Sequence, residues 1–450
     1  MYSQFIQASN GDFVVNDERI MLRGFSIGSW MNMESFMIRI PGSEKRIRQT
    51  FAEVYGQENA DMFFDDYLNY FITEEDFLVL KDLGINVLRI PFGYNHFEDD
   101  QRPGVIKHQG FKHLDRILEL CRKHKIYAIL DMHSSPGGQN PDSHGGGDSG
   151  DSEFWKDASL RERIIKLWGV IADKYKDEYI IAGFDILNEP CFISDKDAFN
   201  DFYERVIQRI RDVDNNHIIF LEGEDWAKDF SVFKKLGGYQ QAISFHFYPG
   251  QHVYMSTGRQ ERKVQLEEKL QYFINLKEKT GMPLWVGETG GHFSKDKLLE
   301  GMELVKDCID LFEKYGISWT IWSYKDAGAM GMIYPKEDTR WISLTNEFRL
   351  KWQAKGRSNP TTANEIFNLL ESKFSYEIDD KLREILKFRI FALLNELHLD
   401  KLVRPKLQSI PWEEIKEYPQ SFLLENCEGS KELAELVMYY TSGSQTVPDK

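Results

Sequence analysis

Eight short apolar segments, separated by segments of helical period, dominate the sequence between residues 22 and 325. Each segment is apolar at nearly every position, which is typical of a strand in a parallel sheet that is covered on both faces. Strands that alternate with helices favour the α/β class. Eight of them predict a closed (β/α)8 TIM barrel, with a doubly wound open sheet as the lesser alternative. The expected strands are residues 22–28, 85–94, 127–135, 181–190, 217–226, 242–250, 283–291 and 318–325.

Segments at both ends extend this barrel. Residues 4–29 read as a short N-terminal hairpin with an Asn16-Asp17 turn that leads into the first strand. After about residue 345 the alternation stops, so we expect a barrel domain over residues 1–344 and a C-terminal helical extension over residues 345–450.

The second helix of this extension carries an apolar stripe. We expect the stripe to pack on the barrel, on a second copy of the chain as a homo-oligomer, or within a small helical unit, and these alternatives stay open. The stripe consists of Leu382, Ile385, Leu386, Ile390, Leu393, Leu394 and Leu397.

Polar side chains mark the carboxyl ends of the expected strands. In a barrel of this type, the residues that act on a ligand gather at these ends. The side chains are those of Arg89, His133, Asn188, Glu189, Glu222, His246, Tyr248, Glu288 and Trp322.

Two carboxylates stand out among them because each ends an apolar run: Glu189 in FDILNEP and Glu288 in WVGETGG. One glutamate after an apolar strand is usually only a solvated strand end. A pair on two strand ends suits glycosidic bond cleavage, in which one carboxyl protonates the leaving oxygen and the other attacks the anomeric carbon. If the strand assignments hold, the two carboxyl groups lie about 5–5.5 Å apart, the spacing of a retaining enzyme. Their pKa values must then be pushed apart, and the charge of Arg89 is expected to do so.

Charge and cysteine content narrow the choice of partner and compartment. A net charge of -16 makes a nucleic-acid or anionic-membrane partner unfavourable, so a neutral ligand fits better. The four cysteines are scattered and indicate free core thiols in a reducing compartment. No window reaches about 18 apolar residues, and the N-terminus does not resemble a leader. We therefore expect a cytoplasmic protein without a membrane partner, or a secreted one if a leader was removed.

Six motifs in chain order resemble glycoside hydrolase family 5, which includes cellulases, exo-β-glucanases and mannanases. The resemblance spans roughly residues 20 to 330. The motifs are LRIP with Arg89, DMH with His133, LNEP with Asn188 and Glu189, FHFY with His246 and Tyr248, GETG with Glu288, and WSY with Trp322.

The resemblance implies a retaining mechanism with Glu189 as acid/base and Glu288 as nucleophile. It further implies that Asn188 bonds the sugar 2-hydroxyl and that His246 tunes the acid/base. Tyr248 and Arg89 would hold Glu288 ionised. His133 would contact sugar hydroxyls, and Trp322 would be a platform for the sugar ring.

Less specific signals surround this set. The loop 134–150, SSPGGQNPDSHGGGDSG, has no phosphate-binding motif and resembles the cleft loop of exo-β-1,3-glucanases. A metal site at His144 with Asp142 and Asp148 is a minor alternative, and no metal or cofactor is expected. Glu222 and Trp226 are expected to line the cleft and contact substrate, although Glu222 could equally be structural. Asp326 is expected either to bind a terminal sugar or to be a solvated loop residue.

The function expected from these features is hydrolysis of soluble β-glucosides or short β-glucans by a retaining, exo-acting enzyme. A β-mannosidase or another β-glycosidase, acting on a glycolipid or a galactofuranoside for example, is the alternative within the same family. A barrel that binds sugar without turnover is the alternative from a different class. The intact Glu189 and Glu288 argue against it.

Overall fold

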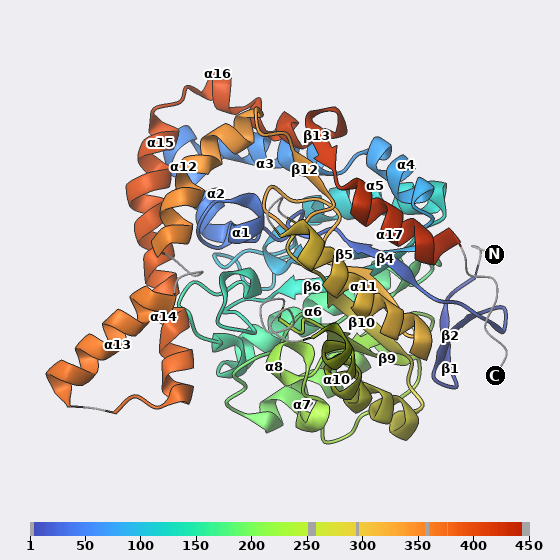
Figure 1. Ribbon diagram of the computed structural model, residues 1–450. Coiled ribbons are helices and arrows are strands. Elements are labelled where there is room, and N and C mark those ends of the chain that lie inside the picture. Colours follow the sequence, from blue (N-terminus) through green and yellow to red (C-terminus); the bar gives the residue numbers. More distant parts are fainter. Residues whose placement is uncertain (1–3, 251–257, 294–296, 356–359, 376, 443–450) are drawn as a thin grey trace.

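The structure is a computed structural model that describes residues 4–250, 258–293, 297–355, 360–375 and 377–442. Eight parallel strands form a closed barrel, and helices cover its outside (Figure 1). The (β/α)8 architecture expected from the sequence is confirmed. In pairing order the strands are β4 (Arg23–Ser26), β5 (Val87–Gly93), β6 (Tyr127–Ser134), β7 (Ile181–Asp185), β8 (Ile218–Leu221), β9 (Gln241–His246), β10 (Leu284–Thr289) and β11 (Ser318–Ile321).

The helices between these strands bury the outer face of the barrel, so every residue of β5 and β6 is buried. The crossover between β8 and β9 has no long helix; it holds α8 (Glu224–Ala227) and a single 3-10 turn, Phe230–Val232. The longer outer helices are α4 (Glu74–Asp82), α5 (Phe111–His124), α6 (Ala158–Tyr175), α7 (Lys196–Arg211), α10 (Arg259–Thr280) and α11 (Leu298–Tyr315).

A small antiparallel sheet of β1 (Gln7–Ser9), β2 (Asp12–Val15) and β3 (Glu18–Arg19) precedes the barrel. Asn16 and Asp17 both have left-handed φ angles, 55° and 63°, as a two-residue hairpin turn requires. The predicted hairpin is therefore present. It packs at the amino end of the barrel, where the Phe13 and Phe220 rings lie 5.9 Å apart.

The connection from β4 to β5 is long and helical, with α1 (Ser35–Ile38), α2 (Glu44–Tyr55) and α3 (Gln57–Phe71) before α4. The rings of Phe51 and Phe63 pack 4.6 Å apart, which fixes α2 against α3. Tyr55 at the end of α2 donates its hydroxyl to the carbonyl of Leu407 at 2.6 Å, so this connection also holds the C-terminal region.

The C-terminal helices are present, as expected. They are α12 (Arg340–Lys355), α13 (Pro360–Phe374), α14 (Asp380–His398), a π-helical turn (Leu399–Val403), α15 (Arg404–Gln408), α16 (Trp412–Ile415) and α17 (Lys431–Ser442). A short strand pair, β12 (Ile333–Pro335) with β13 (Cys427–Gly429), ties the last part of the chain to the loop after β11. Phe422, Leu433 and Val437 belong to the same buried core as the barrel strands. The division at residue 344 stays a prediction, and residues 443–450 of the predicted extension lie outside the described residues.

The apolar stripe of α14 is only partly covered within this chain. Leu386 and Ile390 pack with Phe367 of α13 in a small separate cluster, whereas Leu393 is 60% exposed and Leu397 is 46% exposed. The expectation that the whole stripe avoids solvent is therefore wrong for a single chain, and homo-oligomerisation through these helices stays a prediction. Within the described residues, no helix combines the length and apolarity needed to cross a membrane.

Candidate active site

Nearly all of the predicted site residues meet at the carboxyl end of the barrel. Arg89, His133, His246 and Glu288 lie on strands β5, β6, β9 and β10. The others come within about four residues of a strand end, except Trp226, which lies in the short helix α8, and Asp326. Asp326 is buried farther along the loop after β11, where it accepts a hydrogen bond from the Met330 backbone at 3.1 Å. The residues that follow a strand are Asn188, Glu189, Glu222, Tyr248 and Trp322.

Glu189 stands in a turn rather than on a strand. The strand expected over 181–190 ends at Asp185, and Glu189 has a left-handed φ of 48°. Such a backbone costs free energy in a residue other than glycine, so neighbouring contacts must hold it. The buried carboxylate of Glu222 provides one of them, because it accepts a hydrogen bond from the Glu189 backbone N–H at 2.6 Å.

The Glu189 and Glu288 carboxylates converge on one ring nitrogen. Nδ1 of His246 lies 2.8 Å from Oε1 of Glu189 and 3.6 Å from Oε2 of Glu288. An oxygen of each carboxylate and a nitrogen of His246 all lie within 4.8 Å of one another. Inverting enzymes hold their carboxyl groups about 6.5–9.5 Å apart so that a water fits between them. The observed approach is that of the closer, retaining pair.

Glu288 is held by two donors. Nη1 of Arg89 donates to Oε1 at 2.5 Å, and the Tyr248 hydroxyl donates to Oε2 at 3.0 Å. Arg89 also donates to the side-chain oxygen of Asn188 at 2.8 Å, which orients the residue beside Glu189. These contacts leave the Glu288 carboxylate fixed in direction.

Arg89 lies close to three further carboxylates besides that of Glu288. The guanidinium also lies 3.2 Å from Asp131 and 3.3 Å from both Asp185 and Glu222. Burial raises the pKa of Glu288 above its usual value, and the charges of His246 and Arg89 only partly offset this. Arg89 thus lowers this pKa as expected, but burial outweighs its charge, so the net pKa of Glu288 in the free site is raised.

Two imidazoles surround Glu189 instead. Besides His246, Nε2 of His144 lies 3.2 Å from Oε2 of Glu189. Burial opposes ionisation of Glu189, but hydrogen bonds from His144 and His246 outweigh it and hold its pKa well below the usual range. In the free site these imidazoles and the carboxyl group of Glu189 share the available protons.

Glu222 was expected to reach the substrate, but its side chain is completely buried. One oxygen accepts from the Glu189 backbone, and the other lies 3.3 Å from Nε2 of His246 and 3.2 Å from the Ser244 hydroxyl. Glu222 therefore supports Glu189 and His246 from beneath. These contacts favour the structural alternative for this residue.

His133 and Trp322 form the other side of the site. Their rings stack with centroids 5.2 Å apart and planes 7° apart. Burial disfavours a charged His133, but Asp131 and Glu34 outweigh it and raise its pKa to about 10. Both ring nitrogens then donate: Nδ1 to Asp131 at 2.7 Å and Nε2 to Glu34 at 3.2 Å.

Sequence reasoning missed three residues of the site. Glu34 precedes the short helix α1 and carries no recognisable motif. His144 was considered only as a metal ligand with Asp142 and Asp148. However, Asp142 bonds the Ser143 backbone and Asp148 accepts from the Ser43 hydroxyl, so the set does not converge. Gln139 donates to the carbonyls of His133 and Asn188, both at 2.8 Å. The SPGGQN resemblance was the available signal for Gln139.

The cluster of Glu189, His246 and Glu288 is also the one group in the described part of the chain whose ligand atoms lie close enough for a metal ion. The Arg89 guanidinium already lies 2.5 Å from Glu288, so a cation there would meet a like charge. The arrangement suits proton transfer and nucleophilic attack better than metal binding.

Comparisons with known proteins agree with this geometry. A family model described as Cellulase (glycosyl hydrolase family 5) matches residues 48–328. The chain is 34% identical to a protein named beta-xylosidase from Phanerodontia chrysosporium, over 94% of this chain and 95% of that one. It is 24% identical to a probable glucan 1,3-beta-glucosidase A from Emericella nidulans, over 69% of this chain and 86% of the relative.

Solved structures resemble the fold. The Cel5A of Thermotoga maritima in complex with mannotriose superposes with a TM-score of 0.53 at 20% identity, over 74% of this chain and 97% of the other. At this identity the likeness concerns the barrel alone.

Proposed function

The chain belongs to glycosyl hydrolase family 5 and is a retaining glycoside hydrolase, and we propose that it removes single sugars from the ends of β-glycosides with Glu189 as acid/base and Glu288 as nucleophile. The observation that carries the assignment of the two residues is their approach around His246, with oxygens within 4.8 Å. Retaining enzymes hold their carboxyl groups about 5–5.5 Å apart and inverting ones about 6.5–9.5 Å, so this approach favours direct attack on the sugar by one of the two carboxylates.

In the first step Glu288 attacks the anomeric carbon, and Glu189 gives its proton to the departing oxygen. The bond to the leaving group breaks, and a covalent glycosyl ester forms on Glu288. In the second step Glu189 takes a proton from water, and the resulting hydroxide oxygen attacks the anomeric carbon. Glu288 leaves as a carboxylate, and the sugar keeps its β configuration.

The neighbours of the two carboxylates fit these roles. Arg89 and Tyr248 aim Glu288, and their positive and donor character stabilises it as a leaving carboxylate in the second step. Asn188 lies between Arg89 and Glu189, where its amide reaches a 2-hydroxyl. Because the pKa of Glu189 is held low, this residue takes up a proton of its own only in more acidic solution than an ordinary glutamate does. The proton for the leaving group is available from His144 and His246, which bond Glu189 directly.

Two observations support an exo mode. Trp322 is 2% exposed and His133 is 1% exposed, so the ring pair ends in the protein interior rather than in an open groove. In addition, the relative that aligns over 94% of the chain is named beta-xylosidase and not endoglucanase.

Terminal β-glucosides are the first candidate substrates, in keeping with the relatives named glucan 1,3-beta-glucosidase. β-Xylosides are the second, because the relative named beta-xylosidase aligns over 94% of the chain. A β-mannoside, a glycolipid or a galactofuranoside remains an alternative within the family. A sugar-binding barrel without turnover is disfavoured by the intact carboxylate pair.

A panel of aryl β-glycosides tests the proposal. We expect turnover of a β-glucoside or β-xyloside, with the β-anomer as the first product in NMR spectra. The variant Glu288→Gln should lose at least about a thousandfold in kcat while it still binds the substrate. The matched control Glu300→Gln changes an exposed glutamate on the outer helix α11 and should leave kcat unchanged. Binding without turnover by the wild type, or an α-anomer as first product, would refute the proposal.

A further inference from the structure

A row of aromatic rings runs from the buried end of the site to the C-terminal helix α14. It begins with Trp322 stacked on His133, continues to His144 at 5.8 Å from His133, and reaches Trp226 at 6.0 Å from His144. Phe388 of α14 follows at 5.8 Å from Trp226, and Phe192 lies 6.0 Å from Phe388. The row thus joins side chains from four barrel loops or strands to one from the C-terminal helix.

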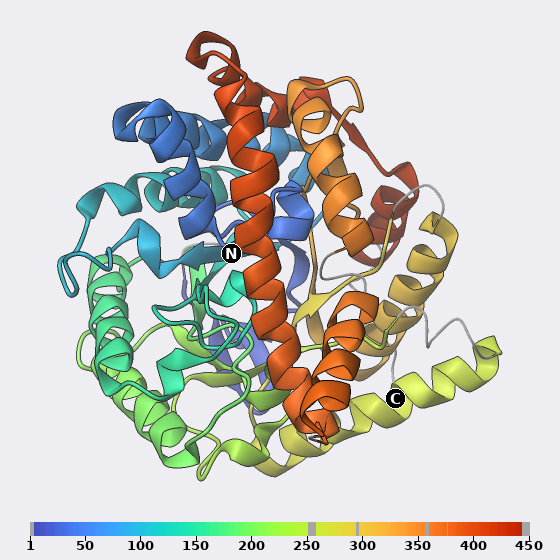
Figure 2. The same cartoon turned by 90° about the vertical axis from the view of Figure 1, so that its left-hand side faces the viewer.

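Contacts with the loops at the barrel mouth fix the position of α14. The backbone of Phe388 and Arg389 lies so close to Gly150 that a β-carbon there would be 2.5 Å away. Arg389 pairs with Asp151 at 2.9 Å, and Arg46 of α2 pairs with Glu396 at 2.6 Å. Figure 2 shows α14 crossing this end of the barrel.

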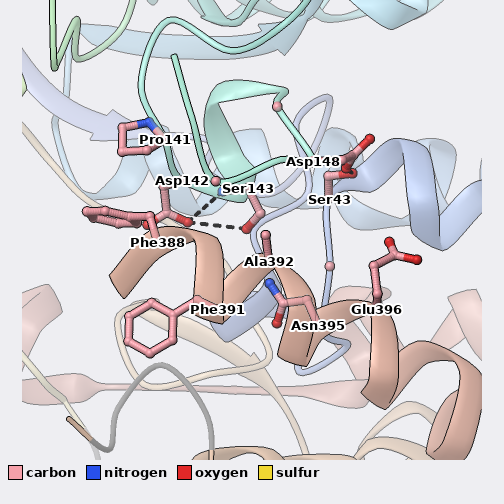
Figure 3. A pocket seen from close by; sticks show the side chains of 13 residues that line it. Ser43, Pro141, Asp142, Ser143, Asp148, Phe388, Phe391, Ala392, Asn395 and Glu396 are labelled. Atoms are coloured by element: carbon pink, nitrogen blue, oxygen red, sulfur yellow. Dashed lines mark hydrogen bonds between the residues drawn. The ribbon is translucent and has the colours of Figure 1, made fainter. Parts of the chain in front are cut away.

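A small pocket of about 20 Å³, partly open to solvent, lies between α14 and the loop 134–150. Phe388 and Phe391 line its helical side, and Pro141 and Asp142 line the loop side (Figure 3). A gap therefore remains between α14 and the cleft loop at this point. Phe388 lines this pocket and also contacts Trp226.

We infer that Phe192, Trp226 and Phe388 form a binding site for the leaving group of the substrate, one that takes a group with an extended apolar face. The inference rests on the proposed role of Glu189 as acid/base. All three side chains are half-buried, so each still presents ring surface to solvent. Uncharged rings of this kind bind the apolar face of a sugar, an aryl group or an alkyl chain.

The order of the row identifies which part of the substrate lies where. The sugar that is attacked must lie beside Glu288, and the oxygen that leaves must lie beside Glu189. Glu189 contacts His144, which is the ring between the buried pair and the three outer rings. A leaving group that departs past Glu189 therefore passes toward Trp226 and Phe388, away from Trp322.

In this arrangement α14 contributes to the specificity of the enzyme for the leaving group of the substrate. Phe388 is the residue of α14 that contacts the row of aromatic rings. The solvent-exposed side chains of α14 do not contribute to the binding site. A substrate whose leaving group is too small to reach Phe388 gains no binding energy from this ring. A larger apolar leaving group gains contact with two or three rings before the bond breaks.

The test compares octyl and methyl β-glycosides of the sugar that the wild type cleaves. In Phe388→Ala the ratio of kcat/KM for the octyl glycoside to that for the methyl glycoside should fall at least about tenfold. The control Leu393→Ala, at a 60% exposed position on the same helix, should keep the wild-type ratio. A disaccharide as third substrate identifies the natural source of the apolar face. A larger loss on the disaccharide points to a second sugar, and a larger loss on the octyl glycoside points to a lipid-like group.

A second measurement tests the same site with an alcohol acceptor, which enters where the leaving group departs. With 1-hexanol as acceptor, the glycosyl ester partitions between transfer and hydrolysis, and Phe388→Ala should lower the share of transfer. A mere loss of folding would lower both products alike and leave this share unchanged. An unchanged octyl-to-methyl ratio in both Phe388→Ala and Trp226→Leu would overturn the inference while the proposed function stands. A wild type that cleaves no glycoside would overturn both.

Discussion

The carboxylate of Glu222 accepts a hydrogen bond from the backbone N–H of Glu189 at 2.6 Å, and it does so from a completely buried position. The same carboxylate lies 3.3 Å from Nε2 of His246, whose other nitrogen contacts Glu189. A single side chain thus supports both the left-handed backbone of Glu189 and the orientation of its imidazole partner.

Glu222→Gln should therefore slow the step that needs a well-placed acid. An amide cannot serve both contacts as an acceptor, so Glu189 shifts, and a shift of about 1 Å costs roughly a hundredfold in rate. We expect kcat/KM to fall by about that factor on an alkyl glycoside and much less on a dinitrophenyl glycoside, whose leaving group needs no proton. Equal losses on both substrates would show that Glu222 does not act through Glu189.

Glu189→Ala should lose most of its activity on alkyl glycosides and retain more on an activated aryl glycoside. Added azide needs no general base, so it should restore the rate on the activated substrate. The product should be the β-glycosyl azide, identified by NMR, because azide attacks the ester on Glu288 from the face that the leaving group vacated. An α-glycosyl azide would mean a single displacement and would rule out Glu288 as nucleophile.

His144→Phe should move the basic limb of the kcat/KM profile to higher pH. Burial already opposes ionisation of Glu189, and the hydrogen bond from His144 is the largest factor that lowers its pKa. Without that donor the pKa of Glu189 rises, so the acid keeps its proton to higher pH. The phenyl ring preserves the ring contact with Trp226. A basic limb that stays in place would show that another group controls it.

Asp326 predicts a pH dependence of stability rather than of catalysis. Burial raises its pKa from the usual 3.8 to about 6. Between about pH 4 and pH 6 the folded chain holds a proton that the unfolded chain has lost, so this residue makes stability fall as the pH rises. Asp326→Asn should lack this dependence. Between pH 4 and pH 7 the difference in unfolding free energy should move in favour of the variant, by at most about 3 kcal/mol. Thermal unfolding of both proteins across this range measures it, and parallel curves would contradict the burial effect.

The barrel could be predicted because its strands are apolar throughout and recur in order. Their ends could not be predicted as well. Ile186 and Leu187 are as buried as the strand before them, yet β7 ends at Asp185. Beyond it the backbone N–H groups of Ile186 and Asn188 still donate to the carbonyls of Phe220 and Met132, but the regular strand pairing has ended. Apolarity indicates burial and not regular pairing, so the sequence did not reveal the turn at Glu189.

Most of the site followed from motifs on successive strands, because consecutive strand ends in a barrel meet at one edge. Contacts between loops could not be read in the same way. His144 reaches Glu189 across 45 positions of chain, and nothing local in its Gly-rich loop indicates that contact. The net pKa of Glu288 depended on burial, which the sequence does not measure. One arginine beside one glutamate predicts a lowered pKa, but burial of Glu288 outweighs the charges of His246 and Arg89.

The pairing of β12 with β13 has a practical consequence for anyone who shortens this polypeptide. Lys325, at the end of the barrel, makes a buried ion pair with Asp76 and donates to the carbonyl of Phe422 at 2.9 Å. A protein cut after residue 344 would uncover that lysine and the apolar surface beneath Phe422 and Leu433. Such a fragment should be recovered as insoluble material.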